Sequence, residues 1–299
     1  PLNAMGAEVD LTDGHAPIHV SGGAALQGMT YPLPIASAQV KSCVLLAGLF
    51  AEGTTTVIET TPSRDHTERM LGLDAHATDG ERHLTVDGGR RIPARTWHVP
   101  GDFSAAAFFL VAGSIVPGST LQLGGVGMNP SRNALLEVLR TMGADITVAN
   151  ERMQGGEPIA DLTVRHADLK AARVADPLIP NLIDEVPVLA VAAACATGRT
   201  VIRDAAELRV KETDRLDAMA QNLRALGAEV EEFEDGLAID GPASLTGTTV
   251  SSFDDHRIAM AMGVAGLVAD GTTTVTEADC ASVSFPTFWD ELQTVATPA

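Results

Sequence analysis

An internal repeat constrains the fold of this chain more than any other feature of its sequence. An alanine-rich, helix-forming stretch runs into Gly and then into a β-branched, strand-forming stretch four times. The four copies span residues 40–57, 104–121, 185–202 and 256–275. Helices that are apolar and small all round are typical of protein interiors, so we expect these four to be buried.

A second, more polar pattern alternates with the first: a helix that stops at Gly and is followed by a strand. The copies are Met5–Val9, Met142–Ile146, Leu226–Val230 and, less clearly, Met70–Asp74. Asp79-Gly80 and Asp235-Gly236 then predict hairpin turns between pairs of strands. The sequence therefore predicts an α/β protein built from repeated units, with the polar helices as its outer layer.

We expect a domain boundary near Val99-Pro-Gly-Asp102, after a predicted strand region at Arg90–Trp97 that contains Pro93. This places a first domain at residues 1–99 and a second at residues 100–299.

Gly124-Gly-Val-Gly127 lacks the third Gly of a dinucleotide-binding loop, and we interpret it as a turn.

Composition excludes several classes of function. The formal net charge of −19 repels nucleic acids and anionic membranes, and aromatic residues at 4% are too few for base-stacking surfaces. Any site for an anion must therefore be built from local Arg and Lys side chains.

Cysteine and histidine spacing points to a protein without metal or disulfides. Cys43, Cys195 and Cys280 lie far apart without a CxxC pattern, so we expect reduced thiols in a cytoplasmic protein. The eight His show no zinc-binding spacing, so we expect no metal, and there is no phosphate-binding loop.

The charged stretch Arg209-Val-Lys-Glu-Thr-Asp-Arg215 is the main candidate for chemistry. Apolar residues at helical spacing follow it at Leu216, Met219, Leu223 and Leu226. A helix N-terminus favours anions, so Lys211 and Arg215 there make most sense if a small anion lies beside them. Glu212 between them offers a group that can hold or move a proton.

Asp254-Asp255-His256-Arg257 repeats this arrangement ahead of an apolar helix. An Asp there would be a good N-cap, whereas His256 and Arg257 oppose the helix dipole and again indicate a bound anion. A solvated, charged helix start is the alternative for either stretch alone. Two such stretches on similar helices favour an anion site.

Other candidates have equally simple structural interpretations. Ser37 and Gln39 could bind a polyol or phosphate, or Ser37 could be a plain N-cap. Arg64 could face an anion, or belong to a capping pattern that starts at Ser63. Asp102 or Ser104 is expected to cap the next alanine-rich helix.

Asp184-Glu185 begins an otherwise apolar helix. The pair could simply complement the helix dipole. If Asp184 is instead half-buried near cations, it is a candidate general base.

Five motifs together resemble one family. In chain order they are Ser37-Ala-Gln39, Pro100-Gly-Asp-Phe-Ser104, Arg209–Arg215, Asp255-His-Arg257 and Ser284-Phe-Pro286. The chain resembles the 5-enolpyruvylshikimate-3-phosphate (EPSP) synthases over essentially its whole length. The resemblance implies an inside-out α/β barrel of βαβαββ units in two domains. It also implies transfer of the enolpyruvyl group of phosphoenolpyruvate to the 5-hydroxyl of shikimate 3-phosphate by a monomer without cofactor.

The resemblance also implies roles for individual residues. Those that would bind shikimate 3-phosphate are Ser37, Gln39, Arg64, Asp184 and Lys211. Those that would bind phosphoenolpyruvate are Gln39, Arg215, His256 and Arg257. Asp184 would act as acid/base at the 5-hydroxyl, Glu212 would protonate the phosphoenolpyruvate methylene, and Lys211 would assist at the hydroxyl.

The chain departs from the family in two ways. Pro1 matches a position well inside the first domain, so roughly the first third of a typical member is expected to be missing. The expected missing part includes a Lys-Ser pair, a Gly-rich loop and an Arg of the family's site. Some members have Lys just before Thr-Phe-Pro, where this chain has Val283 before Ser284. The alternatives are a UDP-N-acetylglucosamine enolpyruvyl transferase and a catalytically incomplete fragment.

Overall fold

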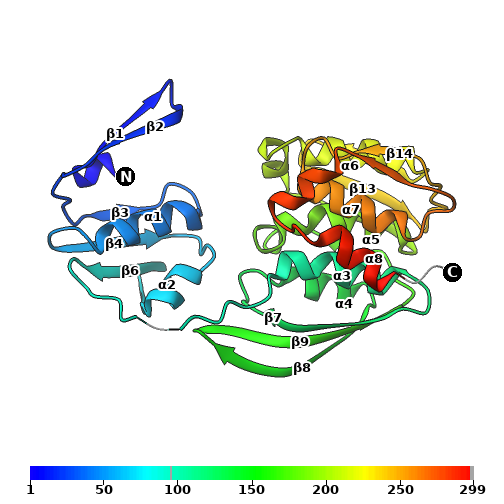
Figure 1. The fold of residues 1–299 in the computed structure, drawn as a ribbon, viewed down its shortest axis with the longest axis horizontal. Helices are drawn as coiled ribbons and strands as arrows, with labels where there is room; N and C mark the ends of the chain where they lie inside the picture. Colours follow the sequence, from blue (N-terminus) through cyan, green and yellow to red (C-terminus); the bar gives the residue numbers. More distant parts are fainter. Residues whose placement is uncertain (95, 297–299) are drawn as a thin grey trace. The chain divides into compact units, whose positions relative to one another are not determined.

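A computed structural model describes residues 1–94 and 96–296. The chain forms two compact units (Figure 1). Unit 1 comprises Pro1–Val99 and Gln154–Glu157, and unit 2 comprises Pro100–Met153 and Pro158–Ala299. Each unit has a hydrophobic core of its own.

Unit 1 is a four-stranded sheet with helix α1 packed on it and a separate two-stranded hairpin. Its elements are η1 (Asn3–Met5), β1 (Glu8–Thr12), β2 (His15–Ser21), β3 (Thr30–Pro32), α1 (Ala38–Gly48), β4 (Thr54–Glu59), α2 (His66–Leu71), β5 (Ala75–Thr78) and β6 (Glu81–Asp87). The sheet order is β3-β4-β6-β5, and only β3 and β4 are parallel.

Unit 2 holds the remaining elements. They are α3 (Phe103–Ile115), β7 (Thr120–Gly127), α4 (Ala134–Thr141), β8 (Asp145–Gln154), β9 (Glu157–Arg165), β10 (Arg173–Val174), η2 (Ile179–Asn181), η3 (Ile183–Glu185), α5 (Val186–Cys195), β11 (Gly198–Ile202), η4 (Ala206–Val210), α6 (Arg215–Ala225), β12 (Glu229–Phe233), β13 (Gly236–Gly241), β14 (Thr249–Ser251), α7 (His256–Gly266), β15 (Thr274–Thr276), η5 (Ala278–Val283) and α8 (Phe288–Val295).

The sheets confirm the predicted repeat. In unit 2, the order β10-β11-β13-β12 reproduces β3-β4-β6-β5 of unit 1, again with one parallel pair followed by two antiparallel pairs. The predicted turns at Asp79-Gly80 and Asp235-Gly236 join β5 to β6 and β12 to β13. The other sheets of unit 2 are β7-β9-β8 and the parallel pair β14-β15.

The alanine-rich helices α3, α5 and α7 contact one another in the interior of unit 2 (Figure 1). α3 and α5 are buried along nearly their whole length because their small side chains allow neighbours to approach on every side. The prediction of buried alanine-rich helices is therefore confirmed for these three. The polar residues Asp102, Glu185 and Asp255 lie at the N-termini of these three helices, as their N-caps.

Two local predictions are wrong. No strand forms in residues 88–94 or 96–99, because Pro93 cannot donate to a ladder; Arg95 lies outside the described residues. Gly124–Gly127 is not a turn but the end of β7, with an irregular register between Leu123 and Val126. There Gly125 adopts a φ of +64° and its N–H donates to the Asp161 carboxylate, which glycine tolerates without strain.

None of the helices in residues 1–94 and 96–296 combines the length and the apolar character needed to span a bilayer.

Candidate active site

Arg215, the first residue of α6, is the centre of a charged cluster in unit 2 and is only 2% exposed. Its Nε donates to Asp255 Oδ2 at 2.7 Å, and its Nη2 donates to Glu212 Oε2 at 2.7 Å. Its Nη1 lies 3.7 Å from Asp184 Oδ1. One guanidinium thus joins three carboxylates that are far apart in the sequence.

Helix capping explains how these groups meet. Asp255 caps α7 by accepting from the backbone N–H groups of Arg257 and Ile258, and it is fully buried. Its carboxylate therefore connects the first turn of α7 to Arg215 on α6. Protein carboxylates surround Arg215, because a buried guanidinium requires anionic partners.

Asp184 lies in η3 between two arginines. Besides its approach to Arg215, its Oδ2 lies 3.8 Å from Arg257 Nη2, and its backbone carbonyl accepts from Arg257 Nη1 at 3.1 Å. The side chain is 15% exposed, so the condition set for a general base, partial burial near cations, is met.

The other predicted residues of unit 2 border this cluster. The Glu212 carboxylate is 52% exposed although it is bound to Arg215, so its second oxygen can reach a ligand. Lys211 contacts the Glu207 carboxylate. Burial, and next the positive charge of Arg257, lower the pKa of His256, which favours its neutral form.

Sequence reasoning missed the buried contacts behind Asp184. Glu185 is buried, and the Ser104 hydroxyl donates to its carboxyl group, while Arg132 Nη2 donates to Ser104 Oγ at 2.7 Å. Asp102 is the N-cap of α3, as predicted, and accepts from the N–H groups of Ser104 and Ala105. Only the acidic pair at 184–185 hinted at this arrangement.

In unit 1, Ser37 caps α1 by accepting from the backbone N–H of Val40 at 3.3 Å. Gln39 lines an apolar hollow of about 440 Å³. Arg64 lies in the loop between β4 and α2, whose N-cap is Asp65. The predicted capping pattern from Ser63 is wrong, because the Ser63 hydroxyl donates to Glu59 at 2.6 Å instead.

A buried ion network ties α1 to the strands and to α2. Lys41 Nζ, fully buried, lies 3.0 Å from Glu59 Oε1 and 2.7 Å from Glu68 Oε1. Arg82 on β6 binds the other oxygen of Glu59 at 3.1 Å. The network holds the loop that carries Arg64, because Glu59 also accepts from the backbone N–H of Ser63. The sequence offered no signal for it beyond a Lys in an apolar stretch.

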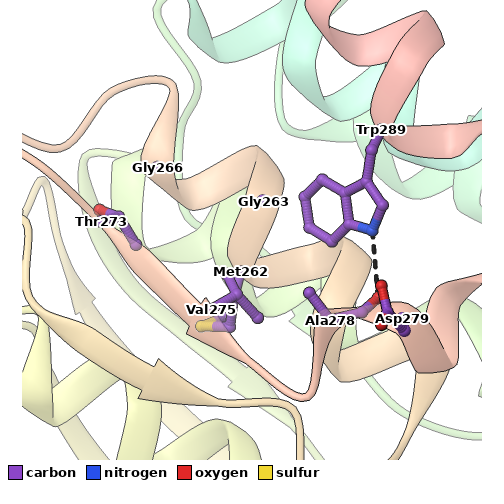
Figure 2. Close-up of a pocket in the computed structure, with 8 residues that line it drawn as sticks. All are labelled: Met262, Gly263, Gly266, Thr273, Val275, Ala278, Asp279 and Trp289. Atoms are coloured by element: carbon purple, nitrogen blue, oxygen red, sulfur yellow. Dashed lines mark hydrogen bonds between the residues drawn. The ribbon is translucent and has the colours of Figure 1, made fainter.

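A separate hollow of about 330 Å³ lies beside α7, β15, η5 and α8 (Figure 2). Its lining combines polar and apolar surface, with Gly263 beside Trp289 and a hydrogen bond from Trp289 Nε1 to the Ala278 carbonyl. None of the predicted site residues is among the eight that line it, so the charged cluster is the better candidate for catalysis.

Cysteine thiols and groups of metal-binding side chains could also form a site. The three cysteines form no disulfide, and burial raises the pKa of Cys195 to about 11, which disfavours its thiolate. Within residues 1–94 and 96–296, no three His, Cys, Asp or Glu side chains are grouped to hold a metal ion.

The comparison with protein families decides the assignment. The model described as EPSP synthase (3-phosphoshikimate 1-carboxyvinyltransferase) matches residues 1–292. The chain belongs to the EPSP synthase family. A 3-phosphoshikimate 1-carboxyvinyltransferase of Salinibacter ruber is 67% identical over 299 residues, which cover 99% of this chain and 70% of that protein. One of Gloeobacter violaceus is 55% identical over 298 residues, covering 99% and 69%.

The fold agrees with solved EPSP synthases. The 2.37 Å structure of EPSP synthase from Acinetobacter baumannii matches with a TM-score of 0.89 and 43% identity, over 98% of this chain and 68% of that one. The repeated α/β units described above are therefore those of the EPSP synthase fold.

Proposed function

We propose that this chain carries the activity of its family. It transfers the enolpyruvyl group of phosphoenolpyruvate to the 5-hydroxyl of shikimate 3-phosphate and releases phosphate, a step of the shikimate pathway to aromatic amino acids. The observation that carries the proposal is the placement of Asp184 between Arg215 and Arg257, with Glu212 bound to the same Arg215.

This placement suits an addition followed by an elimination. In the addition, Asp184 takes the proton of the 5-hydroxyl, whose oxygen attacks C2 of phosphoenolpyruvate, while Glu212 gives a proton to the methylene carbon. In the elimination, Glu212 takes a proton back from the new methyl group, and the departing phosphate takes the proton held by Asp184, which leaves the enol ether as product. Both carboxylates end in their starting forms.

The cations of the cluster suit the donor substrate. Arg215 and Arg257 present planar guanidinium groups, which match carboxylate and phosphate oxygens. A neutral His256 can donate a hydrogen bond without adding a charge beside them. Lys211 contacts an exposed Glu207, a partner that a substrate anion could replace.

We further propose that unit 1 contributes Ser37, Gln39 and Arg64 to the binding of shikimate 3-phosphate, and that units 1 and 2 correspond to the two domains of the family. The chain spans 70% of the Salinibacter ruber relative. We infer that the part of that relative which this chain does not span supplies further groups of the site. We expect a monomer, which light scattering tests, and a location in the cytoplasm, which cell fractionation tests.

The first experiment measures phosphate release with both substrates present and with each omitted in turn. It is run on this chain and on this chain joined to the unspanned segment of the Salinibacter ruber relative. Release that requires both substrates supports the proposal. Release with UDP-N-acetylglucosamine in place of shikimate 3-phosphate would instead support the related transferase, and no release from either protein would contradict the proposed activity.

Replacing Glu212 by Gln is expected to lower kcat by about a hundredfold, because an amide cannot give a proton to carbon. The KM values should change little, since the amide still accepts from Arg215. Steady-state kinetics on the active protein test this, with Glu207→Gln as the control for loss of an exposed carboxylate nearby. An unaltered kcat would remove Glu212 as the proton donor.

Replacing Arg257 by Ala is expected to raise the KM for phosphoenolpyruvate by ten- to about a hundredfold, the usual loss for a charged hydrogen-bond donor. The KM for shikimate 3-phosphate should be less affected. Initial rates with each substrate varied separately give both constants. If the constant for phosphoenolpyruvate stays the same, Arg257 does not clamp that substrate.

A further inference from the structure

The pair Ser104–Glu185 lies directly behind the proposed base and has no part in the chemistry described above. The Ser104 hydroxyl donates to Glu185 Oε1, and both side chains are buried. Arg132 Nη2 donates to Ser104 Oγ at 2.7 Å and lies 3.5 Å from Asp102 Oδ1. A continuous chain of contacts therefore runs from Arg132 through Ser104 to Glu185.

These contacts join three segments at one point. Ser104 is in the first turn of α3, Arg132 precedes α4, and Glu185 is the last residue of η3 and the N-cap of α5. Glu185 neighbours Asp184 in the chain, so a bond that fixes Glu185 also fixes the turn from which Asp184 projects.

The bond needs the carboxyl oxygen of Glu185 more than its charge. Burial raises the pKa of Glu185, and the negative charge of Asp184 raises it further. The hydrogen bond from Ser104 and the nearby charges of Arg257 and Arg132 lower this pKa, but it stays above its ordinary value. The Ser104 hydroxyl can donate to the carboxyl oxygen in either protonation state. Glutamine, which keeps that acceptor, is therefore a close replacement.

We propose that Ser104 and Glu185 are positioning residues, whose hydrogen bond holds the η3 turn so that the Asp184 carboxylate faces Arg215 and Arg257. The Asp184 carboxylate oxygens lie 3.7 and 3.8 Å from the two arginines, so a small movement of the η3 turn changes both distances. The kinetic part of this inference depends on the function proposed above, and the structural part does not.

The test compares Ser104→Ala, Glu185→Ala and Glu185→Gln with the control Ser114→Ala. Ser114 is also a buried serine of α3, but its hydroxyl donates to the Leu110 carbonyl of its own helix. We expect Ser104→Ala and Glu185→Ala to lower kcat on the order of ten- to a hundredfold, since small misplacements of a catalytic group have effects of this size. Both KM values should change less than about twofold, because the substrate contacts remain.

Glu185→Gln is expected to keep most of the activity, and Ser114→Ala all of it. Equal effects of Ser104→Ala and Ser114→Ala would overturn the inference. Circular dichroism measures the fraction of folded protein in each variant. If kcat falls only in proportion to that fraction, Ser104 and Glu185 have a merely structural role and the inference is overturned.

Hydrogen–deuterium exchange supplies a readout that does not depend on turnover. The amides of Ile183–Glu185 should exchange faster in Ser104→Ala than in the unmodified chain, and at the unmodified rate in Ser114→Ala. Unchanged exchange in Ser104→Ala would contradict the inference even if the protein is inactive. An inactive unmodified protein with faster exchange in Ser104→Ala would instead mean that the proposed function fails and the positioning bond stands.

Discussion

Replacing Arg215 by Met is expected to lower the free energy of unfolding of unit 2 by about 3–5 kcal/mol, as when one partner of a buried ion pair is removed. The substitution leaves the fully buried Asp255 carboxylate without its cation, while Met fills much of the volume. Asp255 would keep only the backbone N–H groups that it caps on α7.

Urea denaturation followed by tryptophan fluorescence measures this effect. The protein has two Trp, and Trp97 belongs to unit 1, so a Trp97→Phe background lets Trp289 report on unit 2 alone. Arg199→Met is the matched control, because Arg199 also contacts two carboxylates, Glu231 and Asp240, but does so on the surface. Similar losses in the two variants would show that the burial of Arg215 has no special energetic role.

Replacing Asp184 by Asn is expected to lower kcat by about a hundred- to ten-thousandfold, the usual contribution of a general acid–base group. The amide cannot take the proton of the 5-hydroxyl, although the backbone carbonyl of residue 184 would still accept from Arg257. Binding of both substrates should persist, since the two arginines remain in place.

Initial-rate kinetics on the active protein, with isothermal titration of shikimate 3-phosphate, separate turnover from binding. Asp240→Asn is the control, because Asp240 is a carboxylate paired with an arginine, Arg199, outside the cluster. A kcat within about twofold of the unmodified protein would exclude Asp184 as the base.

Much of the fold could be predicted from local sequence patterns. Alanine-rich helices followed by Gly and β-branched residues repeat along the sequence, and the structure has the corresponding helices and strands. Ser37 and Asp102, which were expected as caps, do cap α1 and α3. The error at Arg90–Trp97 arose because Pro93 removes a donor that a strand would need. The error at Gly124–Gly127 arose because glycine permits several backbone paths, among which strand pairing decides.

The interior of the candidate site was not predictable in the same way. Lys211, Glu212 and Arg215 stood out because charges at a helix N-terminus are conspicuous in a sequence. The contacts of Glu185 and Lys41 were not predictable, since their partners Ser104, Glu59 and Glu68 come from other elements, and only the folded chain brings them together. Which carboxylate faces which arginine depends on these long-range contacts.

The double use of Asp255 limits how this protein can be redesigned. Its Oδ1 accepts from the backbone N–H of Arg257 and lies 3.4 Å from Arg215 Nη2, while its Oδ2 accepts from Arg215 Nε. A mutant library that varies Asp255 alone disturbs both the start of α7 and the counterion of α6 in one step. New combinations are accessible only to libraries that vary positions 215 and 255 together, with Ser, Thr or Asn at 255 to keep the helix start.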